Sequence, residues 1–459
     1  MDYKGALAYL DEHTNLEGGR ASRFADQPVA APTPAMPTAG QVDGLSLAPM
    51  RELMQALGQP HEAFRSIHLT GTNGKGSTAR IAAAAIGDLG LSVGLYTSPN
   101  LSRINERIAW DGVDISDDDF ARIIGLLADV EPLLEHSPSR FELLTAAAFV
   151  HFAEQAVDVA VVEVGLLGRF DATNVIQSDV AVITNVGKDH TTGGPGWPQE
   201  VAREKAGIIK PDSHVILGSP MGELRPIFDA EEPTATIWEA GVDFEIESNE
   251  LAVGGRVIDL RTPGATYDEL YIPFHGAHQG ANTASAVVAL EAFFDRPVER
   301  EVIENALAAV ELPARFEVVA HNPTVILDGA HNPHGAAAVT ATLGREFART
   351  GSRVLIVGIL RGKGVTEMLE AFDAGDFDLV ICTQPDSTRA VPADEIAVEA
   401  EALGLATEVI VSPVEALSRA AAVSSEEDLI LVTGSLYVVA EVREALMEAR
   451  SQATPNAGR

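Results

Sequence analysis

The segment Ser66-Ile-His-Leu-Thr-Gly-Thr-Asn-Gly-Lys-Gly-Ser77 joins a short apolar run to a glycine-rich turn, and an alanine-rich stretch to Ile86 follows. The apolar run predicts a strand and the alanine-rich stretch a helix. A strand, a glycine loop, a lysine and a helix in this order predict a phosphate-binding loop, because the loop N–H groups and the helix N-terminus both attract phosphate. Lys75 is placed to reach the outer phosphates, and Ser77 to hold a metal or a phosphate oxygen. The spacing, with Gly76 between them, is shorter than the commonest form, and the alternative is a plain glycine turn before a helix.

The composition limits the classes of protein to which the chain can belong. Its 459 residues are enough for two or three domains with substantial cores. The formal net charge of −35 argues against a nucleic-acid partner, whose phosphates need a basic face. The single cysteine, Cys382, permits no internal disulfide and fits a reducing compartment. Because no apolar run reaches membrane-spanning length and no signal pattern is present, we expect a cytoplasmic protein without a membrane partner.

Apolar runs that alternate with helical segments predict an α/β fold. Continuous apolar runs suit strands buried in a parallel sheet, and we expect such strands over 67–69, 92–99, 157–164, 179–184 and 215–217. Short β-like runs are expected over 230–275, and a proline-rich loop over 25–44. A second alternation, without a phosphate loop, follows a boundary near 296–314. We therefore predict a P-loop-containing doubly wound domain over residues 1–298 and a smaller Rossmann-like α/β domain over residues 299–459.

Polar residues stand at the carboxyl ends of several expected strands, where ligands bind in open parallel sheets. They are Ser98, Glu163, Asn185, Asp189 and His190. Their oxygen and nitrogen atoms are competent to ligate a hard metal or to orient phosphate. Each residue alone is compatible with an ordinary polar loop, but the set beside a glycine loop indicates a site. Glu163 matters most, because a carboxylate at the end of an apolar strand needs a partner if it is buried.

Three further segments carry polar residues of interest. Lys205 and Lys210 lie near an expected helix end, and the local pattern alone predicts surface charges. His275 and His278 precede a helix without Cys or carboxylates at ligand spacing, which indicates a polar helix entry rather than a metal site. Asp328, followed by a glycine, ends the first strand of the second domain and is a candidate site residue.

With these residues laid out, the chain resembles the bacterial folylpolyglutamate synthase/dihydrofolate synthase family of the Mur ligase superfamily. The matching segments run in family order from about residue 45 to the C-terminus. They are Thr70-Gly-Thr-Asn-Gly-Lys-Gly-Ser77, Tyr96-Thr-Ser-Pro99, 163–174, 184–191, 202–211, 278–282, Ala314-Arg-Phe-Glu317, Asp328-Gly-Ala-His-Asn-Pro333 and Gly434-Ser-Leu-Tyr437. Each motif is moderately specific, whereas the ordered set is highly specific.

The resemblance implies an ATP-dependent amide ligase that uses Mg²⁺. ATP phosphorylates a substrate carboxylate, and the amine of L-glutamate attacks the acyl phosphate. The implied acceptor is dihydropteroate, a folate that already carries glutamate, or both. Phosphoryl transfer depends mainly on positioning and charge neutralisation, which suits a lysine, loop amides and a metal. We expect the enzyme to be a monomer.

The resemblance also implies roles for individual residues. ATP binding is implied for Asn73, Gly74, Lys75, Gly76, Ser77, Asn282, Arg315 and Asp328. Magnesium ligation is implied for Ser98, Glu163 and His190, and also for Lys205, whose counterpart in the superfamily is carbamylated and hence negatively charged. The stretch with Phe170 and Asp171 is associated with the pterin, and His331 and Ser435 lie near the glutamate site. Lys75, Lys205 and His331 are the expected catalytic residues.

The chain departs from the family pattern at three positions. Asn100 stands where the family usually has histidine, Leu167 where it has glycine, and Lys188 where an apolar residue is common. These departures concern the pterin and metal-adjacent details.

Two alternative functions remain at this point. A cell-wall Mur ligase shares the ligation chemistry but carries a nucleotide-sugar domain before the phosphate loop, and the roughly 70 residues that precede the loop here are short for a domain. A nucleotide-binding switch without ligation would not need the second domain with Asp328. Phosphate release that depends on both glutamate and a pteroate or folate distinguishes the three.

Overall fold

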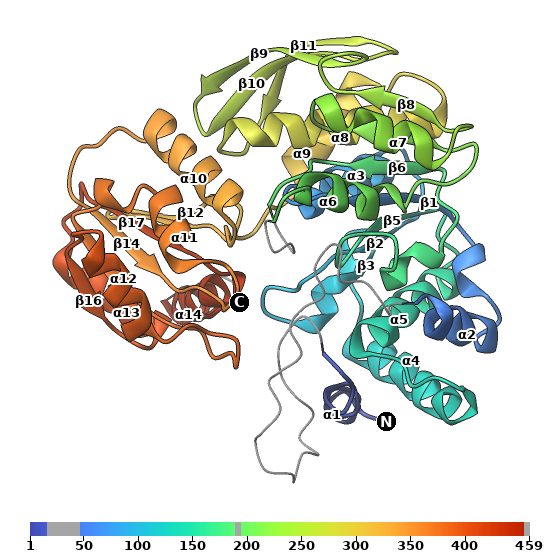
Figure 1. Cartoon of the computed structure of the whole chain (residues 1–459), viewed down its shortest axis with the longest axis horizontal. Coiled ribbons are helices and arrows are strands. Elements are labelled where there is room, and N and C mark those ends of the chain that lie inside the picture. The colour runs from blue at the N-terminus through green and yellow to red at the C-terminus, as the bar shows by residue number, and fades with distance from the viewer. Residues whose placement is uncertain (16–45, 189–193, 454–459) are drawn as a thin grey trace, which may run out of the picture. The chain divides into compact units, whose positions relative to one another are not determined.

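The structure is a computed structural model that describes residues 1–15, 46–188 and 194–453 (Figure 1). The described residues form two compact units. The first lies within Met1–Asn100, Ile104–Pro273 and Ala277–Glu311, and the second within Leu101–Arg103, Phe274–Gly276 and Leu312–Arg459. The long segment of the second unit begins at Leu312, whereas the predicted division lies between residues 298 and 299. The proline-rich loop expected over 25–44 lies outside the described residues.

The first unit is built on a twisted sheet with the strand order β4-β3-β2-β5-β1-β6-β7-β8. The strands from β2 to β8 in this order are parallel, and β3 and β4 add an antiparallel edge. The bounds are β1 (Arg65–Thr70), β2 (Val93–Tyr96), β3 (Ile108–Trp110), β4 (Val113–Asp114), β5 (Val159–Glu163), β6 (Val180–Ile183), β7 (His214–Leu217) and β8 (Thr236–Glu239). The central strands β5 and β6 are buried throughout, as the continuous apolar runs predicted.

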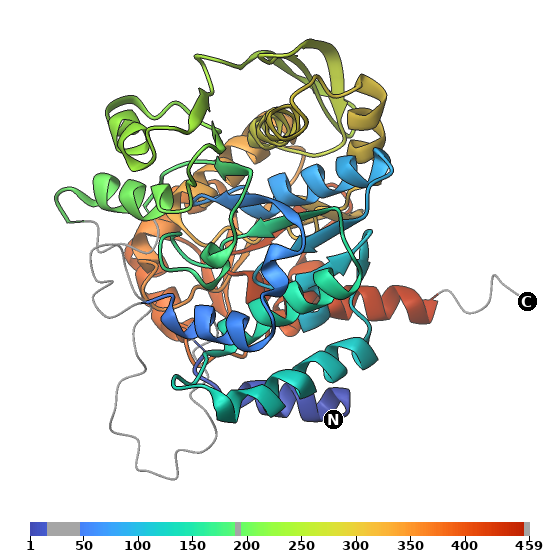
Figure 2. The ribbon, with the colours of Figure 1, turned by 90° about the vertical axis from the view of Figure 1, so that its right-hand side faces the viewer.

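Helices cover both faces of this sheet (Figures 1 and 2). On one face lie α3 (Lys75–Asp88), α8 (Ala277–Phe294) and α9 (Arg300–Ala309). On the other lie α1 (Tyr3–Asp11), α4 (Asp117–Val130) and α5 (Arg140–Glu154), and the unit also contains α2 (Ala48–Ala56), α6 (Trp197–Ala206) and α7 (Arg225–Glu231). Ser139 and Glu142 form a capping box that fixes the start of α5.

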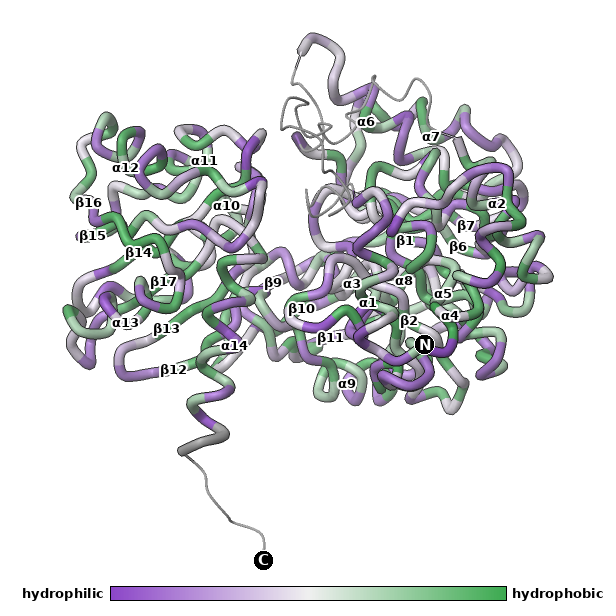
Figure 3. The backbone as a smooth tube through the Cα atoms, turned by 90° about the horizontal axis from the view of Figure 1, so that it is seen from below, coloured by the Kyte–Doolittle hydropathy of each residue, from purple (hydrophilic) through white to green (hydrophobic). Residues whose placement is uncertain are grey.

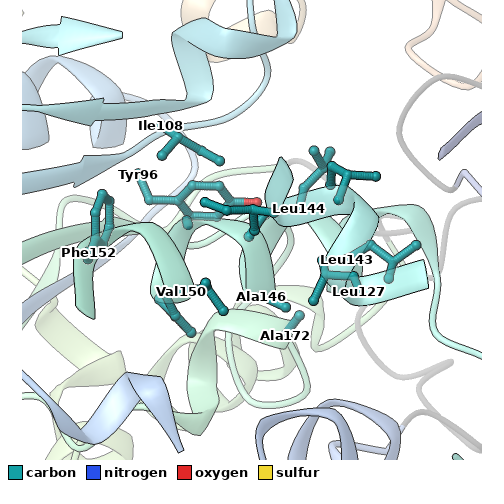
Figure 4. Close-up of a cluster of buried hydrophobic side chains, with 14 of the residues drawn as sticks. Tyr96, Ile108, Leu127, Leu143, Leu144, Ala146, Val150, Phe152 and Ala172 are labelled. Carbon is teal, nitrogen blue, oxygen red and sulfur yellow. The ribbon is translucent and has the colours of Figure 1, made fainter. Parts of the chain in front are cut away.

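The core between β2 and α5 shows why these elements pack closely. Tyr96, Leu144 and Phe152 gather with other buried side chains in one cluster (Figure 4). A Cβ placed on Gly94 would lie 2.7 Å from the ring of Phe152, so only glycine lets β2 approach α5 this closely. Burial of such side chains stabilises the unit by about 1.5–3 kcal/mol each.

A small antiparallel sheet, with the order β11-β10-β9, accounts for most of the short β-like runs predicted over 230–275. Its strands are β9 (Glu245–Ala252), β10 (Gly255–Arg261) and β11 (Thr266–Ile272). Glu291 of α8 is buried and accepts hydrogen bonds from Thr262 Oγ1 at 2.9 Å and from Tyr267 Oη at 2.8 Å. These bonds tie the small sheet to α8, whose residue Asn282 lies against the phosphate loop.

The second unit contains a sheet with the order β12-β13-β17-β14-β15-β16. All neighbours are parallel except β12 and β13. The strands are β12 (Glu317–His321), β13 (Thr324–Leu327), β14 (Arg353–Val357), β15 (Leu379–Cys382), β16 (Thr407–Val409) and β17 (Leu429–Thr433). The helices are α10 (Pro333–Glu346), α11 (Val365–Ala371), α12 (Ala393–Ala402), α13 (Pro413–Val423) and α14 (Leu436–Ala453). The tube in Figure 3 is coloured hydrophobic along much of β14, whose residues are all buried.

The two alternations predicted from the sequence are thus confirmed as α/β units. The hydropathy pattern missed α9, the edge pair β3 and β4, and β12, which are short or only partly buried. In the described part of the chain, no helix has the length and apolar character needed to cross a membrane.

Candidate active site

The turn between β1 and α3 has the geometry that the sequence predicted for a phosphate loop. Gly71 and Gly74 have φ values of +151° and +87°. A Cβ placed on Gly71 would lie 1.8 Å from Thr184 Oγ1, and one on Gly74 would lie 2.3 Å from Asn282 Oδ1. Both positions therefore require glycine for space as well as for backbone conformation.

Two residues that follow β6 hold this loop in place. Thr184 Oγ1 donates to Asn73 O at 2.7 Å. Asn185 Oδ1 accepts from Thr72 N at 3.1 Å and Asn73 N at 3.0 Å, and Asn185 Nδ2 donates to Asn73 O at 3.0 Å. The residues after β6 therefore fix the backbone conformation of the loop at Thr72 and Asn73. The sequence analysis noted Asn185 as a polar strand end but did not assign it to the loop.

Lys75 and Ser77 lie in the first turn of α3, directly after the loop. Lys75 Nζ donates to Gly71 O at 3.0 Å, so its ammonium group lies over the loop. Ser77 is buried at the helix N-terminus, where partial positive charge and backbone N–H groups favour an anion. These positions agree with the predicted phosphate-binding arrangement.

Glu163 brings the end of β5 to the same place. Its side chain is 4% exposed, and its Oε2 accepts from Ser98 N at 3.1 Å. The same oxygen lies 3.3 Å from the position of a Cβ on Gly76. The unusual glycine between Lys75 and Ser77 thus leaves room for the carboxylate beside the loop. Glu163, Ser98 and the loop, predicted separately, lie together.

The donors at this place fit a hard divalent cation. Carboxylate and hydroxyl oxygens are the ligands that Mg²⁺ prefers, and Mg²⁺ usually keeps waters and substrate phosphate oxygens as its remaining ligands. The described residues contain no group of three His, Cys, Asp or Glu side chains suited to a metal. Beside the loop, the described residues thus offer a cation the carboxylate of Glu163 and a serine oxygen. The predicted ligand His190 lies outside the described residues.

Asn282 reaches the loop from α8. Its Nδ2 donates to Gln279 Oε1 at 2.9 Å, and its Oδ1 faces Gly74. Gln279 is completely buried, so it fixes the orientation of the Asn282 amide from inside the protein. The sequence analysis predicted Asn282 but missed Gln279, for which the one-turn spacing on the helix was the available signal.

Lys205 is 3% exposed on α6, so the local prediction of a surface charge is wrong. The loop that follows β5 packs on this helix end: a Cβ on Gly168 would lie 2.7 Å from Glu204 O and 3.3 Å from Lys205 Cα. Lys210 is also not a free surface charge, because it is half-buried and its Nζ donates to Asn174 Oδ1 at 2.8 Å. Burial, with a contribution from Arg51, lowers its pKa to about 8. The sequence pattern led to a wrong prediction of exposure at the end of α6, because charged residues and helix-end signals do not reveal that the loop after β5 covers this helix end.

Phe170 and Asp171 lie in that same loop. Phe170 is half-buried and Asp171 is buried. Asp171 Oδ2 accepts from Leu166 N at 2.7 Å, and Oδ1 accepts from Thr173 N at 3.0 Å. Asp171 therefore shapes the loop in which the resemblance placed a pterin contact.

The structure shows the surroundings of the residues that depart from the family pattern. Asn100 Oδ1 accepts from Arg107 Nε at 2.8 Å, so the asparagine has a polar partner. Leu167 has a φ of +58°, a conformation that costs a leucine about 1–2 kcal/mol and that the usual glycine adopts freely. Its buried side chain packs with Val201. Lys188 is exposed.

In the second unit, Asp328 follows β13 and is 7% exposed. Its Oδ2 accepts from Phe316 N at 2.8 Å, and its Oδ1 accepts from Ala330 N at 2.8 Å. Burial raises the pKa of Asp328 to about 6, against the opposing effects of Arg315 and the two N–H groups. The carboxylate thus organises the turn that carries the other predicted residues.

Those residues lie at the ends of β13 and β17, which are neighbours. His331 Nδ1 lies 2.9 Å from Gly329 O, and Ser435 is buried with its Oγ accepting from Tyr437 N at 3.2 Å. A Cβ on Gly329 would lie 3.1 Å from Arg315 Nη1. The second unit therefore gathers Arg315, Asp328, His331 and Ser435 at one edge of its sheet.

A parallel α/β unit with a glycine phosphate loop, followed by a second α/β unit with a polar strand-end cluster, is the architecture of a Mur ligase. Two family models match accordingly, the Mur ligase middle domain over residues 69–290 and the Mur ligase glutamate ligase domain over residues 314–436. The dihydrofolate synthase/folylpolyglutamate synthase of Mycobacterium tuberculosis is 37% identical over an alignment of 383 residues, which covers 77% of this chain and 77% of that one. The chain belongs to the dihydrofolate synthase/folylpolyglutamate synthase family.

Solved structures agree with this membership. The folylpolyglutamate synthase of Mycobacterium tuberculosis complexed with ADP and AMPPCP has a TM-score of 0.82 and 35% identity, over 88% of this chain and 95% of that one. The bifunctional folylpolyglutamate synthase/dihydrofolate synthase of Yersinia pestis complexed with AMPPNP and Mn ion has a TM-score of 0.80 and 27% identity, over 97% and 98%. The predicted resemblance, the fold class and the class of ATP-dependent ligase are confirmed, and the cell-wall and non-ligating alternatives are not favoured.

Proposed function

We propose that the chain joins L-glutamate to dihydropteroate, to folates that already carry glutamate, or to both, using ATP and Mg²⁺. The observation that carries this proposal is the position of Glu163 against the loop glycine Gly76, with Lys75 and Ser77 on either side. A carboxylate, an ammonium group and a helix N-terminus at one place suit phosphoryl transfer from a metal-bound nucleotide. We also propose that the protein acts in the cytoplasm as a monomer.

In the first step, a carboxylate oxygen of the acceptor attacks the γ-phosphorus of ATP. The new O–P bond replaces the bond to the β-phosphate, and ADP leaves. The loop N–H groups and Lys75 bind and orient the phosphates, and Asn282 packs closely against Gly74. Glu163, Ser98 or Ser77, His190 and a carbamylated Lys205 are the proposed holders of Mg²⁺. When bound, Mg²⁺ neutralises charge on the phosphate oxygens.

In the second step, the amine of glutamate attacks the acyl carbon. A C–N bond forms, the C–O bond to phosphate breaks, and the amine loses a proton. We assign Phe170 and Asp171 to the pterin, and His331 and Ser435 to glutamate. Arg315 and Asp328 are assigned to ATP; the buried Asp328 acts on its surroundings by fixing the turn from Phe316 to Ala330.

The test is phosphate release from ATP with each substrate omitted in turn. We expect release only when L-glutamate and a pteroate or folate are both present. An acceptor labelled with ¹⁸O in its carboxylate should pass one labelled oxygen to the released phosphate, because the acyl C–O bond breaks. Release without an acceptor, or unlabelled phosphate, contradicts the proposal.

The same assay separates the two acceptors. Dihydropteroate and tetrahydrofolate are compared at equal concentrations, and kcat/KM for each shows whether one or both activities are present. Activity with an amino-acid-lacking UDP-linked cell-wall precursor in place of both would support the cell-wall alternative instead.

A further inference from the structure

The loop that carries Phe170 and Asp171 touches the end of α6, where Lys205 lies. Arg169 N donates to Glu204 O at 2.8 Å, and Arg169 Nη2 donates to Arg203 O at 3.0 Å. These bonds satisfy carbonyl groups of the last turn of α6, which have no partner within the helix. The loop that we assign to the acceptor is therefore hydrogen-bonded directly to the backbone of the helix end that carries Lys205, a proposed metal ligand.

Asn174 joins these two segments through its side chain. It lies in the short 3₁₀ helix η4 (Ala172–Val175) and is 6% exposed. Its Nδ2 donates both to Arg169 O and to Gly207 O, each at 2.9 Å. One amide group thus bridges the loop and the residue that ends α6.

Lys210 determines which way this amide faces. Its Nζ donates to Asn174 Oδ1 at 2.8 Å and to Asn174 O at 3.2 Å. An ammonium group can only donate, so it selects the orientation in which the amide oxygen faces Lys210 and the NH₂ group faces the two carbonyls. Hydrogen bonds from a charged donor are also stronger than neutral ones.

We propose that Asn174 and Lys210 are a pair of positioning residues that hold the loop with Phe170 and Asp171 in register with the helix end that carries Lys205. Neither residue belongs to the proposed phosphate, metal or glutamate contacts. The pair acts on the acceptor side, because its bonds end on the loop after β5 and on Gly207. The phosphate loop is held separately, by hydrogen bonds from Thr184 and Asn185. This inference rests on the proposed function, since it requires that loop to bind the acceptor.

The first test compares Lys210→Met with Lys210→Arg and with the control Lys4→Met, which makes the same change at an exposed position of α1. Acceptor affinity is measured by calorimetric titration of dihydropteroate or tetrahydrofolate in the presence of ADP, together with KM for ATP. We expect Lys210→Met to weaken acceptor affinity about tenfold or more, with KM for ATP changed less than about twofold. Arginine can only donate, so Lys210→Arg should restore most of the affinity.

The second test reverses the bonds of Asn174. Asn174→Asp keeps the size of the side chain but places an oxygen against the carbonyls of Arg169 and Gly207, while Asn305→Asp makes the same change at an exposed position of α9. We expect Asn174→Asp to weaken acceptor affinity at least as much as Lys210→Met, and Asn305→Asp to leave it unchanged.

The two levels of inference fail in different ways. An active wild-type enzyme whose Lys210→Met and Asn174→Asp variants bind the acceptor normally overturns the positioning pair alone. Equal losses for ATP and acceptor, without recovery in Lys210→Arg, also overturn it, because they indicate general damage to the fold. A wild-type chain without acceptor-dependent phosphate release overturns the proposed function, and this inference with it.

Discussion

Glu163 and Asp328 occupy corresponding places in two different sheets. Each is a buried carboxylate at the carboxyl end of a parallel strand, β5 in the first unit and β13 in the second. Asp328 accepts backbone N–H groups of its own turn with both oxygens. Glu163 accepts from Ser98 N and lies against Gly76 of the phosphate loop.

This difference in partners separates two roles that position in the fold cannot distinguish. A carboxylate whose two oxygens both hold backbone N–H groups shapes the loop around it. A carboxylate directed at a phosphate loop is placed to act with nucleotide and metal. We therefore expect changes at Glu163 to affect turnover more than stability, and changes at Asp328 to affect stability first.

The largest effect is expected for Glu163→Gln. The amide oxygen can still accept from Ser98 N, but the negative charge beside the loop is lost. We expect acceptor-dependent phosphate release to fall by about a hundredfold or more, the scale seen when an electrostatic group is removed from an active site. The melting temperature should stay near that of the wild type. Glu250→Gln, on an exposed position of β9, is the matched control, and near-normal turnover in Glu163→Gln would refute the assigned role.

A smaller effect is expected for Gly74→Ala, which tests the loop rather than the carboxylate. The added methyl group would meet Asn282 Oδ1 at 2.3 Å, at an overpacking cost of about 1–3 kcal/mol. KM for ATP should therefore rise about tenfold or more. Gly58→Ala introduces the same kind of backbone strain, at a φ of +77°, but meets no atom within 4 Å. If both variants raise KM for ATP equally, contact with Asn282 is not the cause.

These contacts also mark the limit of what the sequence could predict. Apolar runs are local signals, so β1, β5, β6 and the order of the two units were predicted from them. Glu163 and Ser98 were found because parallel strands end at a common edge. In the sequence, Gly76 was only an irregularity in the spacing of the phosphate loop. The reason for a glycine at this position is the nearby carboxylate of Glu163, which lies far away in the sequence.

The remaining site residues depend on tertiary contacts. The burial of Lys205 results from the loop at Gly168, and the orientation of Asn282 results from Gln279. The positive φ of Leu167 contradicts its own propensity, so no local rule predicts it. Such features arise when distant segments pack against one another. The order of the motifs therefore indicated the family, but it could not predict the contacts that hold the site residues in place.

The third prediction concerns Asp328→Asn. The amide must present its NH₂ group to one of the two backbone N–H groups, of Phe316 or Ala330, and that bond is lost. We expect the second unit to lose about 1–3 kcal/mol of unfolding free energy, the cost of an unsatisfied buried donor. Hydrogen exchange of β13, β14 and β17 during urea unfolding measures this loss. Asp373→Asn, at an exposed position of the same unit, should stay within about 0.5 kcal/mol.

The smallest effect is a difference in the response of the two units to acid. His68 in β1 is fully buried, with Nε2 2.9 Å from Thr173 Oγ1, and burial, with a contribution from Lys210, lowers its pKa well below 6.5. The unfolded chain then binds a proton that the folded chain does not. The stability of the first unit from this residue is therefore present above pH 6.5 and is lost as the pH falls below it.

Asp328 has the opposite sign. Its pKa is raised from 3.8 to about 6, so the folded chain binds the extra proton, and the stability from this residue is lost as the pH rises from about 4 through 6. Each contribution has a slope of at most about 1.4 kcal/mol per pH unit.

The difference in unfolding free energy between the wild type and His68→Gln, followed by hydrogen exchange of β1 and β5, should shrink as the pH falls from 7 to 5. The difference between the wild type and Asp328→Asn, followed in β13 and β17, should grow over the same range. If both differences in unfolding free energy change with pH by the same amount and in the same direction, the opposite titration effects assigned to His68 and Asp328 are wrong.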